Sequence, residues 1–285
     1  MQQKVKSKPV KRHFKVFSLN DIRSGYQLGF YLYRGKAEAR PEWVSATEFP
    51  AYKLLEDPKN HHKNHIMAQD NWFSSIPLVG RLMAIGMHSV GTLRQNRKGI
   101  PCSFNTKHGV RQHRERGNYT TVKSAYYVSE ELHDDIYYTA WLDRKPVGIL
   151  HTIPTKQGRC TRMVKSNNDG WQRKQYTRST IVPIYNWGIG GTDSDDQRIE
   201  ANYRPSLKTI SWVPRVLSHF LNAAVVNSFI WYNEVFPIRP LTHYKCRDDL
   251  VNVLVADWLH TKIKETGKIV DYSLTKKQWT REKSR

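Results

Sequence analysis

The stretch Y-N-W-G-I-G-G-T-D-S-D-D-Q, residues 185–197, places aspartates directly behind a pair of glycines. A second acidic motif, D-N-W-F-S-S, opens at Asp70 after a short apolar segment. Asp193, Asp196 and Glu200 have the spacing of residues that share one face of a helix. We therefore predict a strand-end carboxylate at Asp70 and a helix-start carboxylate at Asp193, with Asp196 one turn further along.

Carboxylates from different elements are what a two-metal site needs, because they must converge on cations about 3.5–4 Å apart. Oxygen ligands select Mg²⁺ or Mn²⁺. Gly190 and Gly191 would let the backbone approach such a site closely. We predict metal binding by Asp70, Asp193 and Asp196. The structural alternatives are that Asp70 caps a helix and that the D-x-x-D pair is solvated.

The balance of charge points to a polyanionic partner. The 285 residues include 46 Lys and Arg against 25 Asp and Glu, which gives a formal net charge of +21. Such an excess favours nucleic acid or another anionic surface, although a protein that is merely basic is the alternative. Two basic clusters are candidate DNA contacts: Arg94, Arg97 and Lys98 near Asp70, and Arg173, Lys174 and Arg178 beside aromatic residues. Those aromatic residues, Trp171 and Tyr176, fit base stacking and core packing equally well.

Other classes of protein are less compatible with the sequence. The longest apolar run, residues 216–232, is interrupted by His219, Asn222 and Asn227, so it predicts a buried helix and no membrane span. Three widely spaced cysteines predict reduced thiols in the cytosol or nucleus. The glycines at 188–191 are not a dinucleotide fingerprint, and we expect no small-molecule cofactor.

Periodicity predicts an α/β organisation with a β-rich centre. Before residue 100 we expect strands at 14–19, 26–34, 66–69 and 90–93, with helices at 45–56 and 75–86. From about 101 to 179 helical periodicity disappears and turn signals separate short strands. After Gly191 we expect helices, including one that Pro214 opens and one at 250–263, followed by a basic tail.

Several motifs in this order resemble the transposase domain of the piggyBac family over about residues 8–236. The most specific is Y-N-x-x-x-G-G-x-D-x-x-D-Q from Tyr185. The others are K-P-V-K-R-H-F-K-V-F from Lys8, G-Y-x-L-x-F-x-x-Y-x-G-K from Gly25, D-N-W-F-S-S from Asp70, G-T-L-R-Q-N-R-K-G-I-P from Gly91, Y-R at residues 203–204, and H-F-L-N-A-A-V-V-N-S-F-I-W-Y from His219.

The resemblance implies a ribonuclease H-like mixed sheet flanked by helices and interrupted by a β-rich insertion. We expect ribonuclease H-like parts at 8–100 and 181–265, the insertion at 101–180 and a basic tail at 266–285. The family carries out cut-and-paste DNA transposition with magnesium and three catalytic aspartates, which implies a nuclear protein. Asp70 matches the second catalytic aspartate, Asp193 the third and Asp196 an additional acid.

The family's first aspartate and its strand belong ahead of the segment at Lys8, and we expect both to lie before Met1. Three hypotheses follow. The chain is a transposase-derived domain that is inactive alone, or part of an active transposase whose upstream segment is not in this sequence, or a non-enzymatic DNA-binding protein that reuses the scaffold. A homodimer is a further open alternative.

Overall fold

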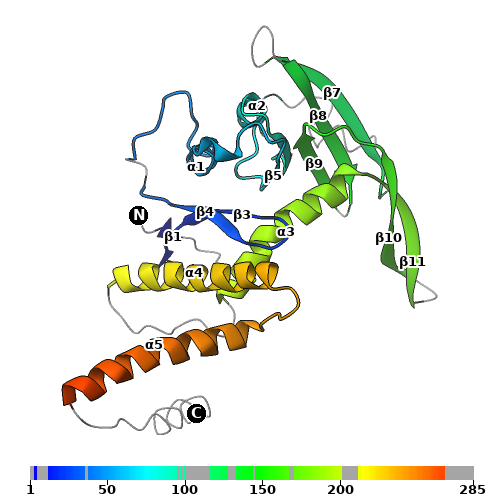
Figure 1. The fold of residues 1–285 in the computed structure, drawn as a ribbon. Coiled ribbons are helices and arrows are strands. Elements are labelled where there is room, and N and C mark those ends of the chain that lie inside the picture. The colour runs from blue at the N-terminus through cyan, green and yellow to red at the C-terminus, as the bar shows by residue number, and fades with distance from the viewer. Residues whose placement is uncertain are drawn as a thin grey trace. The chain divides into compact units, whose positions relative to one another are not determined.

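The computed structural model describes residues 3–4, 12–35, 38–94, 97, 99, 116–127, 133–143, 145–166, 170–200 and 211–266. The chain forms two compact units, Met1–Ala201 and Asn202–Arg285, and each is described by itself. The first unit contains every described strand and the helices up to α3, whereas the second consists of helices (Figure 1). The predicted sites all lie in the first unit.

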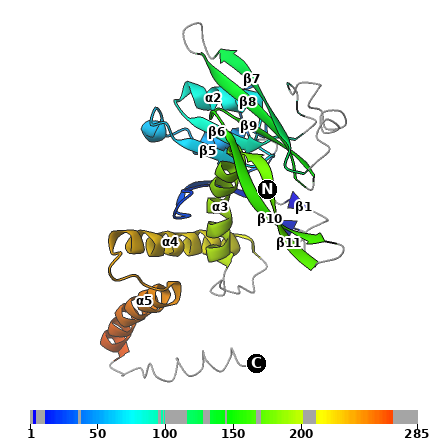
Figure 2. The same cartoon turned by 90° about the vertical axis from the view of Figure 1, so that its right-hand side faces the viewer.

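A five-stranded mixed sheet forms the centre of the first unit (Figures 1 and 2). Its strands, in spatial order, are β5 (Ile66–Gln69), β6 (His88–Thr92), β9 (Pro146–His151), β8 (His133–Leu142) and β7 (Tyr119–Tyr127). β5 pairs with β6 in parallel, and the other pairs are antiparallel. The predicted mixed α/β fold is confirmed.

Helices cover both faces of this sheet because successive strand residues point to opposite sides. Val79 and Met83 of α2 (Ile76–Ala84) pack against Leu150 of β9. On the other face, Ile181 of α3 (Ile181–Glu200) packs against Ile149, the neighbour of Leu150. The other side of α2 packs on α1 (Phe49–Leu54). A 3-10 turn at Pro58–Asn60 follows α1 in the chain.

Three two-stranded elements lie outside the central sheet. β3 (Val16–Asn20) and β4 (Gln27–Leu32) form the antiparallel hairpin that the sequence predicts. β10 (Gln157–Ser166) and β11 (Gly170–Ser179) form a longer antiparallel ribbon. A short pair joins β1 (Gln3–Lys4) to β2 (Arg12–His13). The predicted domain boundaries stay predictions, but β7, β8 and β9 continue the central sheet and do not form a sheet of their own.

Helix α3 corrects one prediction. The sequence predicted that the helix starts near Asp193, whereas α3 begins at Ile181 and Asp193 lies in its second half. The glycines inside it allow close packing: a Cβ at Gly188 would lie 2.5 Å from Cβ of Ala68 in β5. A Cβ at Gly191 would lie 2.9 Å from the carbonyl oxygen of Asp21. Tertiary contacts therefore override the low helix propensity of glycine.

The second unit contains α4 (Val213–Val235) and α5 (His243–Thr266). Pro214 lies in the first turn of α4, as predicted. The prediction that this helix is buried nearly all round was wrong, since Ala223, Val226 and Ile230 are buried but Leu217 and Leu221 are exposed. No helix in the described part of the chain is long and apolar enough to span a bilayer. Apart from Thr266, the predicted basic tail lies outside the described residues.

Candidate active site

The first carboxylate, Asp70, lies where β5 ends and the chain turns toward α2. Its carbonyl oxygen accepts hydrogen bonds from the amides of Phe73 at 3.0 Å and Ser74 at 3.2 Å, which makes D-N-W-F-S-S a tight turn. Ser75 then caps α2 by accepting from the amide of Leu78 at 3.2 Å. The side chain of Asp70 is exposed. A strand end, a turn and a capped helix thus fix the backbone of Asp70.

The turn is also held from outside by a buried acid. The carboxylate of Glu48 is 3% exposed and accepts a hydrogen bond from the Ser75 hydroxyl at 2.5 Å. It also pairs with the guanidinium of Arg81 on α2. Arg81 in turn donates to the carbonyl oxygen of Trp43 at 2.6 Å. This buried network links the start of α1 to α2 and so restricts movement of the Asp70 turn.

The second carboxylate, Asp193, lies on α3. Its negative charge and that of Asp70 both affect the pKa of one tyrosine, Tyr185. The hydroxyls of Tyr185 and Thr92, at the end of β6, form a hydrogen bond of 3.1 Å. Burial raises the pKa of Tyr185, the bond to Thr92 lowers it, and the negative charges of Asp70 and Asp193 raise it further. Helix α3 therefore packs on two parallel strands: Tyr185 bonds to Thr92 at the end of β6, and Gly188 lies against Ala68 of β5, two residues before Asp70.

The other aspartates of α3 have different surroundings. Asp196 is exposed, which is compatible both with a metal ligand and with the solvated alternative. Burial raises the pKa of Asp195, and the charge of Asp196 raises it further. Asp195 is 1% exposed and accepts a hydrogen bond of 2.7 Å from the side-chain amide of Asn20. Arg198, one turn further, donates to the carbonyl oxygen of Ser24. Asp195 and Arg198 thus fasten α3 to the turn of the β3–β4 hairpin, which orients the face that carries Asp193.

Two of the predicted DNA-contacting cations lie against the Asp70 turn. Arg94 donates to the side-chain oxygen of Asn71 at 3.0 Å, and Arg97 donates to the carbonyl oxygen of Trp72 at 2.8 Å. Lys98 lies outside the described residues. The structure therefore places both guanidinium groups against the two residues that follow Asp70.

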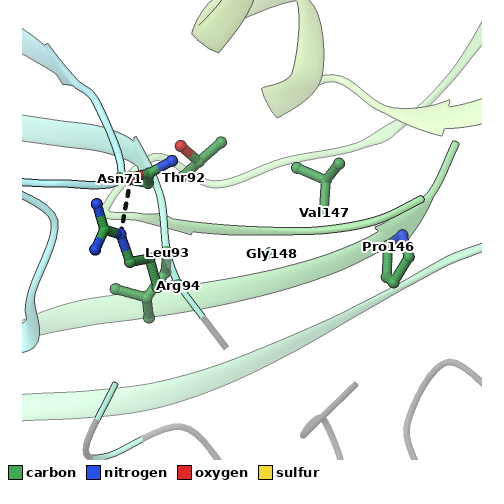
Figure 3. Close-up of a pocket in the computed structure, with 7 residues that line it drawn as sticks. All are labelled: Asn71, Thr92, Leu93, Arg94, Pro146, Val147 and Gly148. Carbon is green, nitrogen blue, oxygen red and sulfur yellow. Dashed lines mark hydrogen bonds between the residues drawn. The ribbon is translucent and has the colours of Figure 1, made fainter. Parts of the chain in front are cut away.

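An open pocket of about 590 Å³ lies next to this contact (Figure 3). Figure 3 shows the Arg94–Asn71 hydrogen bond at one end of the pocket, with Thr92 beside Asn71. The opposite wall is the first part of β9, at Pro146, Val147 and Gly148. The pocket joins the Arg94–Asn71 pair to Thr92, the hydrogen-bond partner of Tyr185.

The remaining predicted cations, Arg173, Lys174 and Arg178, lie on β11 of the separate ribbon. Arg173 and Lys174 are exposed, whereas Arg178 is half-buried. Sequence reasoning did not single out Tyr185, Thr92 or Asn71 as site residues. Tyr185 opens the most specific motif, so its position was a usable signal, but its pairing with Thr92 depends on tertiary packing.

The donor set suits a hard divalent cation held in part by its substrate. The described residues contain no group of three His, Cys, Asp or Glu side chains placed to hold a metal ion. Asp70 and Asp193 are exposed carboxylates, one at the end of β5 and the other on α3, which packs on β5. Mg²⁺ is commonly bound through one or two carboxylates, with water and phosphate oxygens completing its shell. The residues fit this open mode of binding and not a closed cage of protein ligands.

Comparison with known proteins identifies the family of the chain. The class is that of DDE transposases: a family model described as transposase IS4 matches residues 1–229. The chain belongs to this transposase family, and the resemblance to piggyBac-type transposases is confirmed. A cryo-EM structure of the piggyBac transposase synaptic complex with hairpin DNA has the same fold, with a TM-score of 0.71 at 22% identity. The match covers 92% of this chain and 50% of that one, so this chain spans about half the length of that relative.

Proposed function

We propose that this chain is a transposase-derived domain that acts on DNA in the nucleus through a ribonuclease H-like catalytic site. Its ancestral reaction is metal-dependent DNA strand cleavage and transfer. The observation that carries the proposal is that α3, which bears Asp193, packs on β5, which ends just before Asp70: a Cβ at Gly188 would lie 2.5 Å from Cβ of Ala68. The family match and the DNA complex of the related transposase support DNA as the partner.

Each residue of the site has a proposed role. Asp70 and Asp193 hold Mg²⁺ or Mn²⁺, and Asp196 assists from the next turn of α3. A bound divalent ion would supply Lewis-acid polarisation of the phosphate. Arg94 and Arg97 neutralise the DNA backbone beside Asp70, and the Tyr185–Thr92 hydrogen bond fixes the spacing between β6 and α3.

We further propose that this polypeptide by itself cleaves DNA slowly or not at all. The reaction of the family uses three aspartates, and Asp70 and Asp193 match two of them. Two carboxylates position a pair of cations less firmly than three, and the loss of preorganised charge stabilisation lowers the rate of reaction. Mg²⁺-dependent nicking by the purified chain that Asp70→Ala abolishes would overturn this part of the proposal.

Metal binding tests the site directly. Titration of the purified chain with Mn²⁺ is expected to show binding that Asp70→Asn and Asp193→Asn each weaken by about tenfold or more. Asp57→Asn is the matched control, because Asp57 is an exposed helix-capping residue remote in sequence from both motifs and asparagine also caps helices. If both site variants bind Mn²⁺ like the parent chain, the proposed metal site is wrong.

A second function, DNA binding without catalysis, is favoured by a different observation. The described residues hold no three-ligand metal cluster, whereas the chain carries a formal charge of +21. A domesticated transposase remnant of this kind would bind duplex DNA equally well in EDTA and after Asp193→Ala. A gel-shift assay with and without Mg²⁺ separates the two functions, and light scattering of the same samples decides whether the chain is a homodimer.

A further inference from the structure

The β10–β11 ribbon has two chemically different faces. Its register pairs Arg159 with Thr177 and Met163 with Arg173. Directly paired residues of an antiparallel pair share a face, so side chains alternate between faces along each strand. Arg159, Met163, Trp171 and Arg173 therefore lie on one face, which we call the Trp171 face. Lys174 and Tyr176 lie on the other, which we call the Tyr176 face.

The Tyr176 face contacts other residues of the first unit at Tyr176. The guanidinium of Arg116 lies 5.5 Å from the centre of the Tyr176 ring. A Cβ at Gly117 would come within 2.9 Å of Cβ of Tyr176. The ammonium group of Lys174 lies 5.6 Å from the same ring. Tyr176 is accordingly half-buried, and this face has partners within the protein.

The Trp171 face presents large apolar side chains to solvent. Trp171 is 64% exposed and Met163 is 51% exposed, and both Arg159 and Arg173 are exposed beside them. Burying side chains of this size is favourable, so a pair of exposed apolar residues framed by arginines indicates an interaction surface. The sequence left base stacking and core packing open for Trp171, and the structure excludes the core.

Charge identifies the partner. The two strands contain no Asp or Glu. They contain three cations each: Arg159, Arg162 and Lys165 in β10, and Arg173, Lys174 and Arg178 in β11. A surface with arginines and no acid is complementary to a phosphate backbone, and tryptophan and methionine beside arginine suit contact with sugars and base edges. Figure 1 shows the ribbon extending away from the five-stranded sheet, so it can reach a partner.

The dimensions also fit duplex DNA. Each strand has 10 residues, and at about 3.3 Å per residue the ribbon is roughly 30 Å long, close to one turn of B-DNA. The major groove, about 12 Å wide, admits a two-stranded β-ribbon. We infer that the Trp171 face of the β10–β11 ribbon lies along the major groove of duplex DNA, with Trp171 and Met163 against the groove and Arg159 and Arg173 at the phosphates. This inference rests on the proposed DNA binding and assigns part of it to one face.

The test compares neighbouring residues on opposite faces. Binding of the full chain to a labelled 30-base-pair duplex of mixed sequence, about three helical turns, is followed by fluorescence anisotropy at several NaCl concentrations. Arg173→Ala is expected to weaken binding several-fold and to reduce the salt slope by about one. Trp171→Ala is expected to weaken binding by about tenfold. Lys174→Ala removes a charge of the same sign from the Tyr176 face and is expected to cost clearly less affinity and to change the slope less than Arg173→Ala does.

The outcomes separate this inference from the proposed function. If the parent chain binds the duplex but Arg173→Ala and Trp171→Ala bind equally well, or if Lys174→Ala is as damaging, the face assignment is wrong and DNA binding stands. If the parent chain does not bind duplex DNA at low salt, both are wrong. Equal or tighter binding of single-stranded DNA of the same length would overturn the assignment of this face to the major groove. Because Trp171 and Arg173 are exposed, unchanged melting temperatures will show that the variants are folded.

Discussion

At the scale of single residues, His151 is a buried titratable group in the central sheet with hydrogen bonds at both ring nitrogens. It is fully buried. One ring nitrogen, Nδ1, donates to the carbonyl oxygen of Ile153 at 2.8 Å. The other, Nε2, therefore accepts from the Thr139 hydroxyl at 2.9 Å, which in turn bonds to Thr121 at 2.8 Å. A second proton on the ring would require the Thr139 hydroxyl to reverse its hydrogen bonds and would put a charge in a buried site.

Burial accordingly lowers the pKa of His151 to about 4. The unfolded chain takes up this proton near pH 6.5 and the folded chain near pH 4, so stability is highest above pH 6.5 and falls as the pH drops toward 4. We expect a loss of roughly 3 kcal/mol across this window. Urea unfolding at pH 7.5 and pH 4.5 measures it.

The control isolates this one group from the carboxylates that titrate nearby in pH. His151→Gln is expected to be less stable at neutral pH but to lose less stability on acidification. His65→Gln, at an exposed histidine, is expected to keep the pH dependence of the parent chain. An unchanged pH dependence in His151→Gln would show that the burial of His151 is not what makes the fold acid-sensitive.

At the scale of secondary-structure elements, the effect of a glycine-to-alanine substitution on stability depends on which glycine of α3 is replaced. A Cβ at Gly191 would lie 2.9 Å from the carbonyl oxygen of Asp21 and 3.0 Å from Cα of Ile22, both backbone atoms. No atom of the described residues lies within 4 Å of a Cβ at Gly190. Gly191→Ala should destabilise the fold by about 1–3 kcal/mol, whereas Gly190→Ala should stabilise it by about 0.5–1 kcal/mol. Denaturant unfolding of the two variants checks this, and similar values for both would contradict the packing of α3 on the hairpin turn.

The same contrast explains what the sequence could and could not predict about elements. The β3–β4 hairpin and the Ser75 cap of α2 were predictable because alternation, turn residues and Ser-x-Pro are local signals. The start of α3 was not, since local propensity argues against a helix through Gly188, Gly190 and Gly191. Contacts with Ala68 and Ile22 reverse that preference. For the site, the two acidic motifs were visible, but the Tyr185–Thr92 bond joins residues that only the fold brings together.

At the scale of the whole molecule, the net charge of +21 acts on stability and on DNA binding in opposite directions. Like charges repel in the compact state, and salt screens this repulsion. Raising NaCl from about 0.05 to 0.3 M should therefore raise the melting temperature by about 2–4 °C. The same change should weaken DNA binding, because the free energy gained by releasing counterions from DNA falls as the salt concentration rises. Thermal melts and anisotropy on one sample measure both. If salt lowers the melting temperature, repulsion between like charges does not limit the stability of this chain.

The order of strands in the central sheet has a consequence for synthesis. β6 pairs on one side with β5, which precedes it closely, and on the other with β9, which ends at His151. Helix α3 cannot cover the sheet until residues 181–200 have been made. At ribosomal rates, the interval between the synthesis of Asp70 and that of Asp193 is therefore on the order of ten seconds. A nascent chain cannot assemble the proposed two-carboxylate site during that interval, so the proposed binding of a cation would become possible only when the first unit is nearly complete.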